Sequence, residues 1–316
     1  MKKFGDEKAA KTIIKMIEKR NLKIVESKFN DHLRSKQFLL SFLFVLILML
    51  TAVCTAVADE GKPTGDLSLS ILSQYIWRGY ENTRNSIVVQ PSLTVGYKDF
   101  SANVWGNVDT HPYSQTDTSN SSTGTEMDLS LVYNKTLGIV NAGAGYLYYA
   151  LGAPNAGAPK PLDAEEIFVT VGLNTLLTPT LTVYKEIDHY HQYYFLLGVS
   201  HSLELSKIVS LKLGASASYL LSEYADATLY NINSSYGGYP KFNGNYQATD
   251  DKFSNFHDGL ITASLPISLV KYITVSPTVS YSFPLSNDAD NEMRARGRGD
   301  NHSSYVYGGL TCDLSF

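Results

Sequence analysis

Two residues near the end of the chain have the types and spacing that nucleophilic hydrolysis requires. His302 and Ser304 are two positions apart, so in an extended segment both lie on one face, where a histidine can activate a serine. Tyr305 follows the serine, and no third residue is evident that would orient the histidine. The pattern is therefore typical of a solvated loop end, and a lipid hydrolase is kept only as a remote alternative.

Two other segments hold candidate metal ligands. His189 and His191 share a face, with Asp188 and Glu186 close by, but a second spaced pair of ligands is missing. Residues 287–292, Asn-Asp-Ala-Asp-Asn-Glu, gather oxygen atoms without the glycine and the distant glutamate of a calcium loop, so we expect them to form a solvated loop. The chain also has no phosphate-binding loop and no nucleotide fingerprint. The sequence thus predicts no metal site, no cofactor and no enzymatic activity.

The charges are divided unevenly between the beginning and the rest of the chain. Residues 1–58 contain 11 Lys and Arg against 5 Asp and Glu, which leaves 15 and 25 for residues 59–316 and a net charge of −10 there. So acidic a remainder argues against a nucleic-acid partner. A mean hydropathy of −0.11 with a single long apolar run excludes a multi-helix membrane protein.

The basic beginning is predicted to be a leader. Residues 38–58 form one apolar run that ends in Ala56-Val57-Ala58, the small-x-small pattern of a signal peptidase site. We expect cleavage after Ala58, with residues 59–316 as one exported domain. A run of this length is also sufficient for an uncleaved membrane anchor. Cys312 is then the single cysteine of the mature chain, so no internal disulfide is expected.

The mature chain shows hydrophobic alternation with a period of two. In residues 126–134, Met127, Leu129, Leu131 and Tyr133 face opposite to Glu126, Asp128, Ser130 and Asn134, and twelve such stretches follow one another. Each has about ten residues, which is the length that a tilted strand needs to cross a bilayer. Three prolines interrupt these stretches and predict local bulges: Pro91, Pro266 and Pro277.

The connections and the aromatic residues favour a barrel over a soluble sandwich. Every second connection has two to five residues, while the others are mostly longer and rich in Asn, Ser, Gly and Asp. Outer-membrane barrels sort their loops in this way, with short turns in the periplasm. Aromatic residues of the apolar face gather in two girdles: Tyr75, Trp77, Tyr146, Tyr148, Tyr193, Phe195, Tyr219, Tyr281 and Phe283 toward the long loops, and Tyr97, Phe100, Tyr133 and Phe316 toward the short turns.

If the apolar face meets lipid, the opposite face lines the interior. Its charged residues are nine acids and two bases: Arg78, Asp109, Glu126, Asp128, Glu166, Glu186, Asp188, Glu204, Lys212, Asp258 and Asp313. Such a lining concentrates cations in a narrow pore. Aromatic side chains also point inward and offer stacking surfaces for solutes: Trp105, Tyr149, Tyr184, Tyr194, Tyr272, Tyr305 and Tyr307. The alternative is that these residues bond to one another inside a plugged barrel, because roughly 8 strands already fill their interior and open porins begin near 16.

The opening of the mature chain resembles the TorF-type porin family of Gram-negative outer membranes. The resemblance rests on a Tyr-x-x-Arg-Gly stretch at Tyr75, on the pair Gln90-Pro91, and on Trp105-Gly106-Asn107. Residues 193–205 are a second likeness, and Phe316 looks like the terminal signal read by the barrel-insertion machinery. Outer-membrane phospholipase A also has twelve strands, with a His-x-Ser-Asn site that this chain lacks at Tyr305. The porin resemblance implies a channel but names no cargo.

The combined prediction is an all-β, twelve-stranded antiparallel transmembrane barrel in the Gram-negative outer membrane. We expect a channel for passive diffusion of small hydrophilic solutes with a preference for cations. Its expected partners are outer-membrane lipid, the insertion machinery and small solutes. A non-conducting structural or receptor barrel that binds partners through its outer loops is the main alternative. The longest connection, residues 222–254, suits either an inward constriction or an outward receptor surface.

Overall fold

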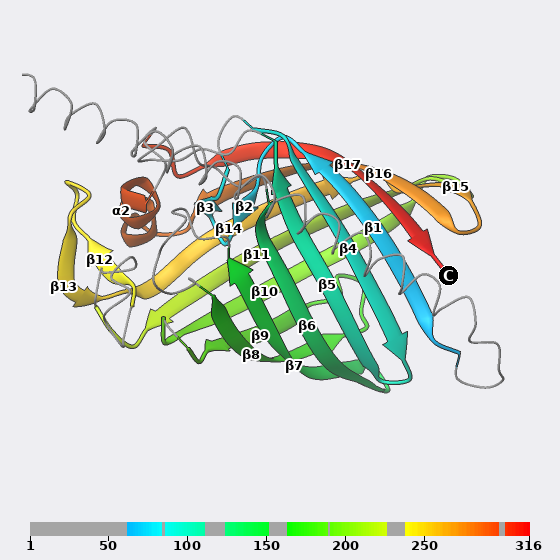
Figure 1. The fold of residues 1–316 in the computed structure, drawn as a ribbon, viewed down its shortest axis with the longest axis horizontal. Helices are drawn as coiled ribbons and strands as arrows, with labels where there is room; N and C mark the ends of the chain where they lie inside the picture. Colours follow the sequence, from blue (N-terminus) through cyan, green and yellow to red (C-terminus); the bar gives the residue numbers. More distant parts are fainter. Residues whose placement is uncertain are drawn as a thin grey trace, which may run out of the picture.

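The computed structural model describes residues 62–83, 86–110, 124–151, 163–188, 190–225, 238–296 and 301–316. Within these residues, twelve antiparallel strands form one closed wall (Figure 1). Closure joins the first strand to the last, with Asp66 opposite Ser315 and Leu72 opposite Gly309. The wall strands are β1 (Thr64–Leu72), β4 (Val88–Tyr97), β5 (Phe100–Asp109), β6 (Gly124–Leu137), β7 (Val140–Leu151), β8 (Ala164–Leu173), β9 (Thr180–Glu186), β10 (Gln192–Glu204), β11 (Ser210–Ser222), β14 (Ser254–Ser264), β16 (Ile273–Pro284) and β17 (Tyr305–Ser315), with the short β15 (Ile267–Val270) continuing β14 along β16. The predicted fold is confirmed.

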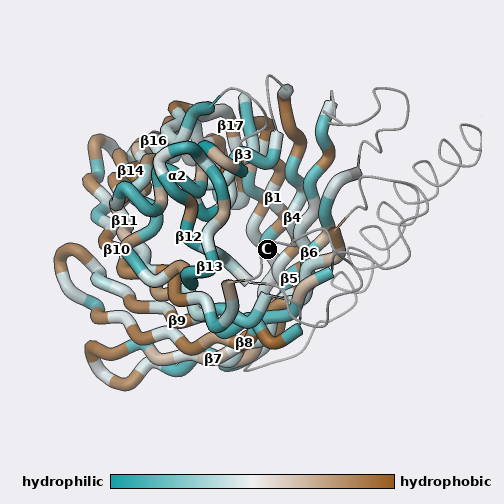
Figure 2. The backbone as a smooth tube through the Cα atoms, turned by 90° about the vertical axis from the view of Figure 1, so that its left-hand side faces the viewer, coloured by the Kyte–Doolittle hydropathy of each residue, from teal (hydrophilic) through white to brown (hydrophobic). Residues whose placement is uncertain are grey.

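The two faces of the wall differ as the alternation predicts. Large aliphatic side chains in the middle of outward-facing rows stay about half exposed: Leu131 50%, Val169 55%, Leu197 53%, Ile261 51% and Val279 51%. Hydrophilic and hydrophobic positions alternate along much of each strand, which gives the banded strands of Figure 2. In a closed sheet every strand has two neighbours, so the backbone amides are paired without an edge strand. The outer surface then presents its apolar side chains without exposed backbone groups.

The two ends of the barrel are different. Tight turns join β4 to β5, β6 to β7, β8 to β9, β10 to β11 and β15 to β16, and the carboxyl terminus lies at this tight-turn end (Figure 1). The connections at the opposite, long-loop end contain the remaining elements: β2 (Ile76–Trp77), β3 (Tyr80–Glu81), β12 (Pro240–Phe242), β13 (Ala248–Lys252) and the helix α2 (Asn287–Arg296). Figure 2 looks from the long-loop end and shows α2 and β12 in front of the opening.

The helix α2 lies where the sequence predicted only a solvated loop. Ser286 caps it, because its Oγ accepts the backbone N–H of Ala289 at 3.1 Å. Acidic residues follow in the first turn and Arg294 and Arg296 stand in the last, which complements the helix dipole. No helix within the described residues is long and apolar enough to cross a membrane. The predicted leader, residues 1–58, lies outside those residues.

The prediction of bulges at the three strand prolines was wrong. Pro91 faces Leu69 and Pro277 faces Leu310 in ladders whose register does not change. Pro266 separates β14 from β15, yet the register with β16 is the same on both sides of it, and it shifts only beyond Ser268. In an antiparallel sheet each N–H serves only one neighbouring strand, so a proline removes one bond and keeps its acceptor. The carbonyls of Pro266 and Pro277 accept backbone N–H groups at 3.1 and 2.9 Å.

A bulge occurs instead in β14, beside two residues that share the interior. The register between β11 and β14 shifts by one residue between Ala217 and Tyr219. His257 and Asp258 stand at this shift, and both are buried, at 0% and 5% exposure. A regular strand would send adjacent side chains to opposite faces, whereas a bulge lets both point inward.

Candidate functional site

The tight-turn half of the bore is lined by small polar side chains. Hydroxyl and amide groups bond across neighbouring strands, such as Ser70 to Thr311 at 2.8 Å and Asn103 to Ser92 at 2.8 Å. These inward residues remain half-buried, so the lining leaves open space. A recess of about 630 Å³ opens at this end between Thr94, Ser101, Lys271, Tyr272, Phe316 and their neighbours.

The long-loop half is occupied by the hairpin of β2 and β3. Its turn residues Arg78 and Gly79 have φ angles of 48° and 80°, and positive values at both positions suit a tight two-residue hairpin. Tyr75 and Trp77 belong to this inserted segment, which corrects their predicted place in the outer girdle. Their rings lie 5.5 Å from Trp105 and 5.8 Å from Tyr149, two inward-facing wall residues.

Arg78 is bound by the wall at the tip of this hairpin. Its two terminal nitrogens donate to both carboxylate oxygens of Glu166 at 2.8 and 2.7 Å, and the two side chains are only 10% and 2% exposed. The guanidinium carbon lies 4.2 Å from the ring centre of Tyr194 and 4.7 Å from that of Tyr184. Burial alone would lower the pKa of Arg78, but the Glu166 carboxylate outweighs it and raises that pKa. Arg78 is therefore a fixed cation in the bore.

The hairpin and α2 interlock. A Cβ atom at Gly79 would overlap Met293 Cε and would lie 3.0 Å from Asp258 Cβ, so the hairpin turn packs directly against both elements, and its positive φ favours glycine there. Met293 belongs to a buried cluster that joins helix, wall and loop, formed by Tyr194, Leu220, Tyr239, Phe253, Ala289 and Met293. The long-loop half of the barrel thus has a packed core. Part of the longest connection contributes to it through Tyr239 and Phe253, so this part faces inward.

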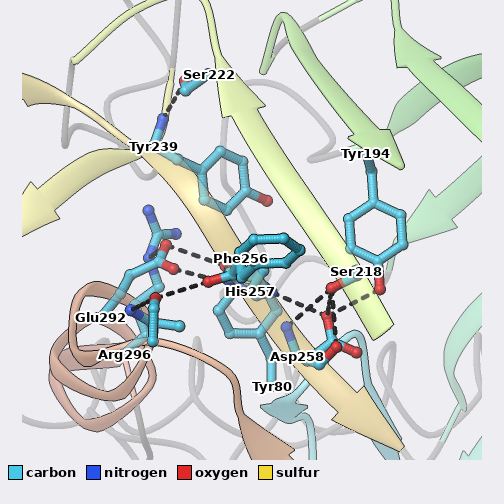
Figure 3. Close-up of polar contacts among 12 residues, drawn as sticks. Tyr80, Tyr194, Ser218, Ser222, Tyr239, Phe256, His257, Asp258, Glu292 and Arg296 are labelled. Carbon is cyan, nitrogen blue, oxygen red and sulfur yellow. Dashed lines mark hydrogen bonds and ion pairs between the residues drawn. The ribbon is translucent and has the colours of Figure 1, made fainter. Parts of the chain in front are cut away.

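A chain of polar contacts links that core to the wall (Figure 3). His257 Nδ1 lies 3.0 Å from Asp258 Oδ1, and His257 Nε2 lies 3.0 Å from Glu292 Oε2 on α2. Tyr80 of the hairpin donates its hydroxyl to Glu292 at 3.0 Å. Arg296 holds the same carboxylate through Nε at 2.9 Å. Hairpin, helix and wall therefore meet at one buried cluster, which we call the His257 cluster.

Asp258 extends the His257 cluster along the wall. It accepts hydroxyl groups from Tyr194 at 2.8 Å and Ser218 at 2.6 Å. His257, Glu292 and Arg296 were absent from the predicted lining. The bulge that turns His257 inward has no local signal, while the cap and charge pattern of α2 was present in the sequence.

The predicted interior charges have different environments. Glu186 accepts the backbone N–H groups of Asp188, Tyr190 and His191 at 2.6 to 3.0 Å, so it organises a turn. Asp109 is buried and accepts a hydrogen bond from Ser86. Asp188, Glu204 and Lys212 are exposed at the ends of the barrel. Asp313 lies on the inward face of the tight-turn half and accepts Ser68 Oγ at 2.7 Å.

Glu126 and Asp128 remain as an acidic pair on β6, toward its long-loop end. They contact each other, and Tyr75 of the inserted segment contacts Glu126. The His257 cluster adds Glu292 to the interior as well as Arg296 and His257, while Asp188, Glu204 and Lys212 lie outside it, so the predicted set of nine carboxylates and two bases does not describe the interior.

The predicted aromatic lining is divided in the same way. Tyr149, Tyr184 and Tyr194 surround Arg78, and Trp105 packs on Tyr75, so these rings contact protein groups. Tyr305 and Tyr307 face inward beside Ser282 and Ser280 on β16. Tyr272 lies in the turn between β15 and β16 and lines the recess at the tight-turn end.

The rim residues with candidate chemistry stay apart from this core. His302 and Ser304 are exposed, and the His302 carbonyl accepts the Tyr305 hydroxyl at 2.7 Å. His189 lies outside the described residues. Among those the structure does describe, no group of three or more His, Cys, Asp or Glu side chains is arranged to hold a metal ion.

No family model and no curated protein matches this chain. Three solved structures to which the chain is similar are a "KdgM porin", a "NanC porin" and the "COG4313 outer membrane channel from Pseudomonas putida F1". The first is 8% identical with a TM-score of 0.44 and covers 79% of this chain and 99% of its own. The second is 8% identical with a TM-score of 0.44, covering 80% and 98%. The third is 10% identical with a TM-score of 0.41, covering 82% and 97%. TM-scores this low carry no argument about this chain, so the barrel is supported by its own strand pairing. The similarity to these structures assigns no activity.

Proposed function

We propose that this protein is a porin-like channel of the Gram-negative outer membrane for passive diffusion of small hydrophilic solutes. The observation that carries the proposal is the sidedness of the wall. Half-exposed aliphatic rows cover the outside, while hydroxyl and amide groups line the tight-turn half of the bore. Such a surface is stable in hydrocarbon, and such a lining is stable in water.

The channel would place its tight-turn end in the periplasm, as outer-membrane barrels do. The recess at that end is then a periplasmic vestibule. Phe316 closes the last strand beside Gly65 of the first, where the barrel-insertion machinery would read it. Solutes would pass from the vestibule toward the layer of Arg78, which is the narrow part of the path.

A preference for cations would come from Glu126 and Asp128. Arg78 is paired with Glu166, and Glu292 is shared by His257 and Arg296. The acidic pair carries the field that an approaching ion would meet, because low-dielectric walls focus it along the bore.

Planar-bilayer recording tests the channel. Purified wild-type protein should give small or infrequent current steps, because the hairpin and α2 fill the long-loop half. Arg78→Gly should give larger and more frequent steps, since it removes the clamp on Glu166. Thr170→Val, a change on the inward face of β8 in the open half, serves as the control and should record like the wild type. If neither wild type nor Arg78→Gly gives stepwise current, the channel proposal fails.

The packed long-loop half favours a second candidate, a non-conducting barrel that binds partners through its outer loops. The core of Tyr194, Leu220, Phe253 and Met293 is the specific observation behind it. The same recordings separate the two candidates, because a non-conducting barrel should give no current steps in either the wild type or Arg78→Gly. The remote hydrolase alternative makes a different prediction, namely lipid turnover that Ser304→Ala abolishes.

A further inference from the structure

Arg78 comes from the inserted hairpin, where it lies 4.6 Å from the ring centre of Trp77, and its other partners come from three neighbouring strands of the wall. Glu166 lies on β8, Tyr184 on β9 and Tyr194 on β10. Together they present one carboxylate and two ring faces to a single planar cation. We call these three side chains the wall pocket. It is a property of the barrel, and Arg78 is its occupant.

The wall pocket is held in shape by contacts that do not involve Arg78. Tyr149 donates its hydroxyl to Glu166 at 2.9 Å. The Tyr194 hydroxyl is fixed by Asp258 at 2.8 Å, and Phe168 packs against Tyr184 with ring centres 5.4 Å apart. Because these partners belong to the wall, the pocket should keep its geometry when the hairpin is absent.

The neighbouring carboxylate does not compete for the cation. Glu186 faces Glu166 across β8 and β9, but its oxygens accept three backbone N–H groups. Glu166 meets the guanidinium with both of its oxygens, one of which also accepts the Tyr149 hydroxyl. Each of them receives one nitrogen of the guanidinium, at 2.8 and 2.7 Å.

This geometry distinguishes a guanidinium from an ammonium ion. A planar fork of N–H donors meets a carboxylate in two parallel bonds, whereas an ammonium is a point charge that cannot match both oxygens equally. A guanidinium also stacks on aromatic faces and loses less hydration when it is buried. Ring centres at 4.2 and 4.7 Å from the guanidinium carbon provide two such faces.

We propose that the wall pocket is a binding site for solutes that carry a guanidinium group, and that Arg78 occupies it as an internal substitute for such a solute. The inference rests on the proposed channel function and names its solute class. A guanidinium solute that takes the pocket displaces Arg78, and the hairpin then loses its ion pair with the wall. Solute recognition in this way loosens the hairpin inside the bore.

Arg78→Gly tests the site directly in the full-length protein in detergent. Its φ angle of 48° suits glycine, so the change empties the pocket without adding backbone strain. The chain has two tryptophans, Trp77 beside the pocket and Trp105, whose emission reports on occupancy. Methylguanidinium should change that emission at millimolar concentration and should bind about tenfold more tightly than methylammonium. Wild-type protein should not respond at the same concentrations, because Arg78 fills the site.

The double variant Arg78→Gly with Glu166→Gln is the matched control. It keeps the two tyrosine faces but lacks the carboxylate, so the preference for methylguanidinium should disappear. Equal binding of both cations by Arg78→Gly, or an unchanged preference in the double variant, overturns the proposal. If Arg78→Gly does not fold on its own, its folding yield becomes the readout. Methylguanidinium must then restore folding better than methylammonium, and failure of both overturns the site.

This experiment is independent of conduction. Guanidinium binding without current in bilayers would leave a ligand-binding barrel and remove the channel. Stepwise current without guanidinium binding would leave the channel and remove the site.

Discussion

The two halves of the bore share one wall but differ in what fills them. In the tight-turn half the inward side chains are short, such as Ser70, Asn103 and Thr311, and a recess of about 630 Å³ remains open at its end. In the long-loop half the inward positions hold large or charged groups, such as Tyr194 and Glu166, and inserted segments cover them. One half has the character of a vestibule and the other that of a protein core.

The two halves differ because the connections at their ends differ in length. A tight turn of a few residues cannot reach into the barrel, whereas a long connection can fold back and bury apolar surface there. The inserted groups then need partners, and the wall supplies them where Glu166, Asp258 and Tyr194 point inward. The same alternating strands therefore build an open lining or a closed core, depending on the size and charge of their inward side chains.

The largest expected effect that separates the two halves is at Glu166. Glu166→Gln leaves the buried Arg78 guanidinium without its counter-ion, which costs about 3–5 kcal/mol of unfolding free energy. Thr170→Val is the matched change in the open half, on the same strand and face, where a hydroxyl bonds to Thr182 at 3.0 Å. It should cost about 1 kcal/mol or less. Urea unfolding in detergent, followed by tryptophan emission, measures both.

Equal costs for Glu166→Gln and Thr170→Val would mean that the long-loop half is not a packed core. The expected gap is large because a buried unpaired charge is penalised far more than a lost hydroxyl pair at a wet surface.

A second comparison uses two glycines with positive φ. Gly79→Ala should cost about 1–3 kcal/mol, because its Cβ meets α2 as well as an unfavourable backbone angle. Gly138→Ala carries the backbone penalty alone, about 1 kcal/mol, since nothing lies within 4 Å of its Cβ at the tight-turn end. Differential scanning fluorimetry gives the two shifts in melting temperature. Only Gly79→Ala should also alter the emission of Trp77. The same change in emission from Gly138→Ala would contradict a specific contact between Gly79 and the helix.

The wall could be predicted from the sequence because its signal is local and repeated. Twelve alternating stretches and the lengths of the connections fix the strand number and the facing of most wall residues, among them Glu166 and Tyr194. The prediction for the prolines was wrong because a strand tolerates the loss of one backbone N–H. The proline keeps its carbonyl acceptor, and the remaining backbone hydrogen bonds hold the ladder in register.

The contents of the bore could not be predicted in the same way. The alternation of β1 continues through Tyr75, Trp77 and Arg78. No local sequence signal therefore distinguishes an inserted hairpin from a continuation of the wall strand. His257 points inward only because the register between β11 and β14 shifts there. The capping serine, first-turn acids and last-turn arginines of α2 were readable, but ten residues with few apolar positions give a weak helical period.

Ion selectivity gives a smaller contrast between the halves. Glu126→Gln with Asp128→Asn should lower the cation-to-anion permeability ratio by about twofold, because these acids lie in the narrow part of the path. Asp66→Asn with Asp313→Asn removes two charges from the tight-turn half of the bore and should change the ratio by less, because water and salt screen them. Reversal potentials in a salt gradient, recorded in an Arg78→Gly background, measure both. A larger effect from the substitutions at Asp66 and Asp313 would show that the selective layer lies at the tight-turn end instead.

The smallest expected effect concerns acid and α2. Hydrogen bonds from Asn255 and Lys241 hold the pKa of Asp288 below its usual value. Burial would raise the pKa of Asp290, but Arg294 and Ser303 outweigh it and lower that pKa. A lowered folded pKa means that the stabilisation is complete above the ordinary pKa near 4 and is lost as pH falls through the folded value. These groups are partly exposed, so the loss should be about 0.5 kcal/mol each. The protection factors for hydrogen exchange of residues 286–296 should therefore fall in acid before those of β8, and Asp290→Asn should reduce the dependence. Protection factors in α2 that stay constant between pH 7 and 3 would show that its attachment is apolar, through Ala289 and Met293.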